Sequence, residues 1–169
     1  MNYESCGVIA GRSNNLSGDD MNGETHGAGA VASWSIAALF LQPDLPMLAL
    51  GLPVAVIAAG FPDSWNPTLY FVKVKTFEGH RGVSHWLLTC LLTTALIYGR
   101  SFDLACFWLA GYLSHLVLDL FTGGGYYLFG PLPVMIGTSL ARNGEWLDTL
   151  LSKVLLGVPL VCLVLSVLK

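Results

Sequence analysis

From residue 27 onward, long apolar runs alternate with short polar stretches. Spanning a hydrocarbon core takes about 17–25 apolar residues, and several runs lie at or below the lower end of that range. Backbone groups in lipid must pair within their own segment, so we expect each run to be a helix. A barrel would need alternating apolar and polar positions, which the runs lack. The pattern predicts an all-α fold, a polytopic transmembrane bundle of about four to five helices, from the runs 27–41, 45–61, 83–98, 102–121 and 154–168.

The first 25 residues differ from the rest of the chain. Asn, Ser, Gly and Asp dominate them, and they contain almost no apolar run. Such a segment buries too little apolar surface to offset the entropy of ordering. We therefore expect a flexible polar tail at residues 1–25 and a membrane-embedded helical domain at residues 26–169.

Composition supports the membrane assignment. Of the 169 residues, 54% are hydrophobic and 11% are charged, whereas soluble domains carry about 25% charged residues. The formal net charge of −3 lacks the basic excess that nucleic-acid binding requires. The expected partner is the lipid bilayer, with no nucleic acid.

The basic residues suggest an orientation. If all five runs span the membrane, the tail and the loops after the second and fourth runs share one side. The opposite side then holds only Arg100 and Lys169. Because loops rich in Lys and Arg stay inside, we expect the N-terminus in the cytoplasm. The basic residues on that side are Arg12, Lys73, Lys75, Arg81, Arg142 and Lys153.

Histidines and carboxylates gather at the ends of the runs on this same side. His115 and Asp119 are four residues apart, so they project from one face of a helix. A charged Asp within an apolar helix costs roughly 2.5–3.5 kcal/mol at mid-membrane, so it needs compensation. Imidazole and carboxylate are ligands of zinc, manganese and iron. The candidate ligands of a divalent cation are His26, Asp63, His80, His85, His115 and Asp119.

Other interpretations of these residues are open. A lone His in an apolar helix is more often a hydrogen-bonded structural residue. His115 and Asp119 could form an intrahelical pair, and His80 could be an ordinary loop residue. Ser84 and His85 are neighbours, which we expect to point apart, so a serine nucleophile is disfavoured. The sequence has no G-x-S-x-G, Walker or H-E-x-x-H motif. The clustering of six groups favours a metal.

Four short segments resemble a known family. HRGVSH at residues 80–85 is similar to the H-R-G-x-[ST]-H motif of the YdjM-like inner-membrane proteins. GYLSH at 111–115, followed by Asp119, resembles a second motif of that family. THG at 25–27 and FPD at 61–63 match two shorter ones. The resemblance covers roughly residues 24–133.

The resemblance implies a multi-pass protein of the bacterial inner membrane and a metal-dependent hydrolase. The metal, zinc before manganese or iron, would polarise the scissile bond and lower the pKa of a bound water. The expected catalytic residues include Asp63 and His85. Arg81 would hold a substrate phosphate or carboxylate, or else anchor the chain at the interface. Glu78 would act as a general base, or else is merely solvated. Similarity to zinc-dependent phospholipase C suggests a phosphoester or lipid-like substrate.

One segment departs from the family pattern. The family reads L-P-D-x-D-H-P where this chain has Trp65 and Asn66 at the positions of the second Asp and the His. Two family ligands are therefore missing, which leaves a site with fewer metals or a protein that cleaves nothing. The alternative function is a non-catalytic metal-binding or transport-related membrane protein. Polar groups at one face alone favour an interfacial site over a path through the membrane.

Overall fold

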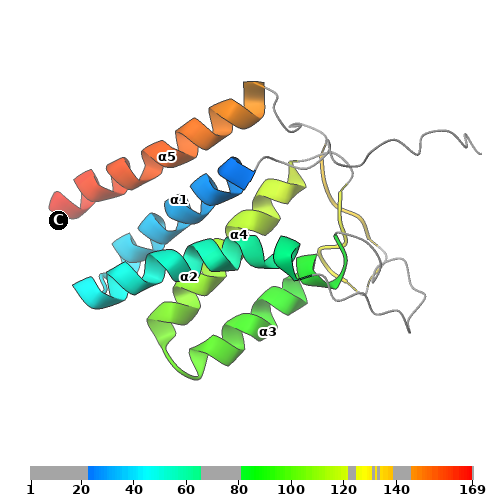
Figure 1. Cartoon of the computed structure of the whole chain (residues 1–169), viewed down its shortest axis with the longest axis horizontal. Coiled ribbons are helices and arrows are strands. Elements are labelled where there is room, and N and C mark those ends of the chain that lie inside the picture. Colours follow the sequence, from blue (N-terminus) through cyan, green and yellow to red (C-terminus); the bar gives the residue numbers. More distant parts are fainter. Residues whose placement is uncertain are drawn as a thin grey trace, which may run out of the picture.

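The protein is an all-helical bundle, as the sequence predicts (Figure 1). The computed structural model describes residues 23–65, 81–121, 125–130, 132, 134–138 and 146–168. The described part contains five α-helices and one short 3₁₀ helix. These are α1 (Gly23–Leu41), α2 (Leu45–Ser64), η3 (Val83–His85), α3 (Leu87–Tyr98), α4 (Phe102–Leu120) and α5 (Trp146–Val167).

Three helices, α2, α4 and α5, are long and apolar enough to cross a membrane. Four or five spans were expected. Of the α-helices in the described part, α1 and α3 are outside this set, and α3 shows one reason. It has 12 residues, which rise about 18 Å against a hydrocarbon core of about 30 Å. The apolar run that begins at Val83 is divided because η3 forms its first turn and the α-helix starts only at Leu87.

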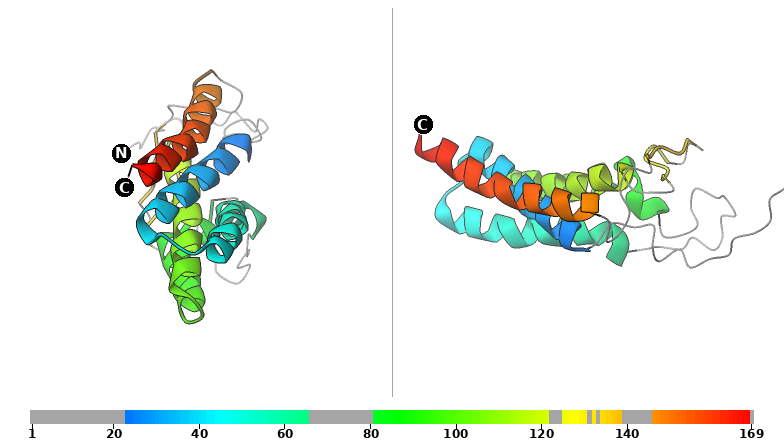
Figure 2. Two further views of the ribbon diagram at one scale, coloured as in Figure 1. Left: turned by 90° about the vertical axis from the view of Figure 1, so that its left-hand side faces the viewer. Right: turned by 90° about the horizontal axis from the view of Figure 1, so that it is seen from above.

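The helix ends that carry the candidate ligands lie at one end of the bundle. In Figure 1, α1, α3 and α5 begin on the right, and α2 and α4 end there. The central helix α4 packs against α1, α2 and α3, while α5 packs on α1. The view from above in Figure 2 shows the elongated bundle with the C-terminus at the opposite end. Segments far apart in sequence therefore meet at one end.

Glycines let α2 and α4 approach closely. A Cβ atom on Gly111 would lie 2.1 Å from the carbonyl oxygen of Ala55, and one on Gly51 would lie 2.5 Å from the ring of Phe107. Small residues at such crossings allow helix backbones to touch. Asp63 and His115 both lie beyond this crossing, toward the same end of the bundle, so the crossing brings their side chains together.

The start of α1 is fastened to α5. Thr25 Oγ1 donates a hydrogen bond of 2.5 Å to Oδ1 of Asp148, and both residues are buried. Residues 23–25, expected in the polar tail, form the first turn of α1 instead. Of these three residues only Thr25 is buried, and its burial follows from this contact with α5.

The described residues after α4 pack at the end of the bundle that carries the candidate ligands. Tyr126 and Ile136 exchange two backbone hydrogen bonds of 3.0 and 2.9 Å, and Leu87 N–H donates to Leu128 O at 2.8 Å. The buried Tyr126 hydroxyl donates to Leu116 O at 2.6 Å. These bonds hold the segment against the end of α4 and the start of α3.

Candidate metal centre

Four donor atoms from three separate segments come together at this end of the bundle. His85 Nε2 lies 3.1 Å from His115 Nε2 and 3.4 Å from Asp63 Oδ1. It also lies 3.3 Å from Asp119 Oδ2. His115 Nε2 lies 3.5 Å from the same oxygen of Asp63 and 3.6 Å from the same oxygen of Asp119. We call these four side chains the four-donor group.

The four imidazole–carboxylate distances within the four-donor group, 3.3 to 3.6 Å, fit a metal ion better than direct hydrogen bonds. A tetrahedral zinc site with ligands at about 2.1 Å has edges of about 3.4 Å. By contrast, N–H···O hydrogen bonds are about 2.7–3.2 Å long. The 3.6 Å between His115 and Asp119 is too long for the intrahelical hydrogen bond that was the simplest alternative. The donor set and its spacing therefore suit a divalent cation.

His85 is oriented by its sequence neighbour. Ser84 Oγ lies 3.1 Å from His85 Nδ1, and both residues are fully buried. The expectation that these neighbours point apart was wrong, because they lie in a tight 3₁₀ turn rather than an α-helix. With Nδ1–H donating to Ser84 Oγ, the Nε2 lone pair is left for the four-donor group. The Tyr112 hydroxyl donates to the Ser84 carbonyl and fixes the turn.

The electrostatic surroundings of His85 favour a positive charge. Burial by itself would lower the pKa of His85, but the nearby carboxylates of Asp119 and Asp63 outweigh it and raise this pKa above its ordinary value. A cation at Nε2 would gain from the same two carboxylates.

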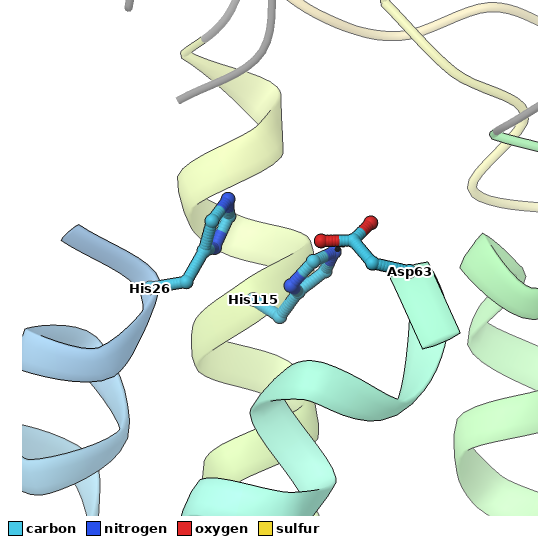
Figure 3. Close-up of side chains that lie close together, drawn as sticks. All are labelled: His26, Asp63 and His115. Carbon is cyan, nitrogen blue, oxygen red and sulfur yellow. Dashed lines mark ion pairs between the residues drawn. The ribbon is translucent and has the colours of Figure 1, made fainter. Parts of the chain in front are cut away.

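His26 lies beside His115, a member of the four-donor group, with Asp63 on the other side of His115 (Figure 3). Its Nε2 is 3.5 Å from Asp119 Oδ1, whereas His85 approaches Oδ2 of the same carboxylate. The His26 ring stacks on His115, with ring centroids 4.3 Å apart and an angle of 24° between the ring planes. An ion lies in the plane of the imidazole that binds it, so two stacked rings do not direct lone pairs at one point. His26 also forms a wider group with Asp63 and His115, with donor atoms within 4.8 Å of one another.

Two buried imidazole nitrogens add to the capacity for a ligand. Nδ1 of His26 and Nδ1 of His115 have no hydrogen-bond partner among the described residues. A buried polar atom without a partner costs about 1–3 kcal/mol. Such atoms point to a ligand, water or ion at the site.

Arg81 borders the group, and its charge sets the balance of the site. Its Nε lies 3.8 Å from Asp119 Oδ2, and its side chain is 14% exposed. With neutral imidazoles, Asp63, Asp119 and Arg81 carry charges of −1, −1 and +1, which leave −1 in total. A divalent cation would reverse this to +1, which suits an anionic substrate.

Three residues that the sequence connected with the site or with the family pattern lie outside the described part. His80 and Glu78 are among them, and so is Asn66. Trp65 follows α2, is 43% exposed and stacks on Phe61 with ring centroids 5.3 Å apart. The four-donor group is complete without the positions at which this chain departs from the family pattern.

Two residues that support the site cannot be recognised from the sequence. Tyr112 lies within the GYLSH segment, but nothing in the sequence says that its hydroxyl reaches Ser84. Asp148 reads as an ordinary acidic residue in the first turn of a helix, where such residues are common. Only the packing of α5 on α1 shows that it holds Thr25 beside His26.

A comparison with protein families identifies the family of this chain. Residues 21–168 match the family model described as YdjM inner membrane protein. Neither a curated protein nor a solved structure matches the chain. The matched region contains the four-donor group, His26 and Arg81. The chain therefore belongs to the YdjM inner membrane protein family.

Proposed function

We propose that this protein is a membrane-bound, metal-dependent hydrolase of phosphoesters. The four-donor group would hold one divalent cation, with zinc the first choice and manganese or iron the alternatives. The single observation that carries the proposal is that the His85 and His115 Nε2 atoms lie 3.1 Å apart and each lies 3.3 to 3.6 Å from an oxygen of Asp63 and of Asp119. Two imidazoles with carboxylates are a donor set that catalytic zinc sites use.

The residues around the cation would have separate tasks. The bound cation would polarise the scissile bond and lower the pKa of water. Asp63 marks the open side of the site, because its side chain is 42% exposed while that of Asp119 is 5% exposed. His26, whose Nε2 lies 3.5 Å from Asp119 Oδ1, would limit the movement of that carboxylate by contact. Arg81 would bind an anionic oxygen of the substrate.

His80 and Glu78 stay in the proposal as predicted residues. His80 would add a ligand, and Glu78 would accept a proton as a general base. The charge balance of the site supports an anionic substrate, because Arg81 and a dication together exceed the charge of the two carboxylates. A phosphoester meets this requirement better than a neutral ester does.

A transport or purely structural role is the rival function. A transport path needs polar groups through both halves of the membrane. In the described part, the buried His and Asp side chains all lie at one end of the bundle; they are His26, His85, His115, Asp119 and Asp148. This arrangement favours chemistry at the interface.

Metal analysis and hydrolysis assays on the detergent-purified protein test the proposal. We expect about one zinc per chain and metal-dependent cleavage of bis(p-nitrophenyl) phosphate. His115→Ala should lose both, whereas Val117→Ala, a half-exposed position on the same helix, should keep both. Metal-loaded wild-type protein that cleaves no phosphoester would support the rival function. Absence of bound metal would refute the site.

We also propose that the protein lies in the bacterial inner membrane with its N-terminus in the cytoplasm. The excess of Lys and Arg on one predicted side supports this orientation. Reporter fusions at the N-terminus and at Gly99, between α3 and α4, test it. A periplasmic N-terminus would reverse the orientation.

A further inference from the structure

A cavity of about 210 Å³ lies beside the candidate metal centre, between the start of α1 and the end of α2. One end is polar and carries two of the site residues. The rest is lined by small or apolar side chains. The lining includes His26, Asp63, Gly27, Val56, Ala59 and Gly60.

Two glycines keep this cavity open. A Cβ atom at Gly27 or Gly60 would meet no described atom within 4 Å, whereas one at Gly111 would collide with Ala55. Gly111 at the α2–α4 crossing therefore allows the two helices to touch. Gly27 and Gly60 instead leave free space next to the site.

The polar end of the cavity has capacity for a ligand. The His26 side chain lines it and is buried, with 8% of the residue exposed. Its Nδ1 has no hydrogen-bond partner within the described part of the chain. Asp63, the half-exposed member of the four-donor group, lies on the opposite wall.

The other end of the cavity reaches the apolar outer surface of the bundle. Val56 lies seven residues before Asp63, which is about 10 Å along the helix. Val56 is 44% exposed, and its neighbour Ile57 is 61% exposed. Both belong to α2, a helix able to cross the membrane. The cavity thus changes from polar at the helix end to apolar toward the middle of the helix, as a phospholipid does from headgroup to acyl chain.

We propose that this cavity admits a membrane phospholipid sideways from the bilayer and binds it as substrate. This inference rests on the proposed hydrolase function. The phosphodiester would lie at the polar end of the cavity, beside His26 and the cation that Asp63 would help to hold, with the start of an acyl chain beside Gly60 and Val56. In the reaction, a water oxygen forms a new bond to phosphorus, one P–O ester bond breaks, and the leaving alkoxide takes a proton.

Filling the cavity tests the proposal. Gly60→Leu is compared with Gly157→Leu, because a Cβ at Gly157 on α5 also meets no described atom within 4 Å. Each protein is reconstituted in phosphatidylethanolamine–phosphatidylglycerol vesicles that contain a photoactivatable phosphatidylglycerol. We measure labelled peptides by mass spectrometry, bound zinc, and hydrolysis of phosphatidylglycerol and of bis(p-nitrophenyl) phosphate.

We expect labels on the α1 and α2 peptides that line the cavity, in wild type and in Gly157→Leu. Gly60→Leu should keep its zinc but lose about tenfold or more of this labelling and of lipid hydrolysis relative to the soluble substrate. Unchanged labelling in Gly60→Leu, or equal loss on both substrates, would overturn the proposal. Specific labelling without hydrolysis of either substrate would support the lipid site and refute the hydrolase.

Discussion

The Nε2 atoms of His85 and His115 lie 3.1 Å apart, although the residues are 30 positions apart in the chain. Two lone pairs at this distance repel each other, so a proton or a cation must lie between them. Asp63 and Asp119 each have a carboxylate oxygen within 3.6 Å of both nitrogens. The two imidazoles are therefore expected to act as one unit.

Removing either imidazole should abolish tight metal binding. We expect His85→Ala and His115→Ala each to weaken zinc binding by more than the 10–100-fold typical of a supporting residue. The double variant should be little worse than either single one, because the remaining donors no longer form a site. Competition with a chromophoric chelator measures the affinities. Full additivity of the two losses would show that the imidazoles bind separate ions.

Ser84→Ala should weaken the site without removing a ligand. The change deletes the acceptor for His85 Nδ1–H, and such losses cost about 10–100-fold in metal affinity. Ser152→Ala is the matched control, since the exposed Ser152 hydroxyl bonds only within α5. Chelator competition again provides the measurement. Equal affinities in the two variants would mean that Ser84 does not orient His85.

Acidification should release the metal from a pH above the ordinary histidine value. The pKa of His85 is raised from 6.5, and a proton on Nε2 excludes a cation. We therefore expect zinc affinity, measured by chelator competition from pH 8 downward, to begin falling before pH 6.5 is reached. An affinity that stays constant until well below that pH would contradict the prediction.

The folding stability of the metal-free protein should rise as the pH falls, whereas the zinc affinity should decrease. Because folding raises the pKa of His85, the protonated form stabilises the folded state. This contribution is complete below 6.5 and is lost as the pH rises through the raised pKa. Thermal unfolding with excess chelator should show it, and His85→Ala should remove it.

Gly111→Ala should separate α2 from α4. The new Cβ would lie 2.1 Å from the Ala55 carbonyl oxygen, and overpacking of this kind costs about 1–3 kcal/mol. The unfolding midpoint in detergent and the zinc affinity should both fall. Gly157→Ala, with open space at its Cβ, should be neutral or slightly stabilising. Equal behaviour of the two variants would show that the crossing does not position the site.

Much of the fold follows from the apolar runs. The predicted run 45–61 corresponds to α2 (Leu45–Ser64), and the run 102–121 corresponds to α4 (Phe102–Leu120). A long apolar run indicates where a helix lies because lipid leaves the backbone no partner outside its own segment. The predicted helix 154–168 was too short, because the more polar first turns of α5 from Trp146 resemble a loop in sequence.

The sequence indicated which residues belong to the candidate site, but not how they are arranged in space. His85, His115 and Asp119 were selected because polar groups in apolar runs need compensation. That His26 stacks on His115 depends on the angle between α1 and α4. Sequence spacing within one helix carries no information on that angle.

The four-donor group joins the end of α2, η3 and α4, three segments that separate when the chain unfolds. A ligand bound there links the three segments at one end of the bundle. Its binding free energy therefore adds to the free energy of folding. Cells short of the metal would therefore contain less of this protein, because membrane proteases would degrade the loosened chains.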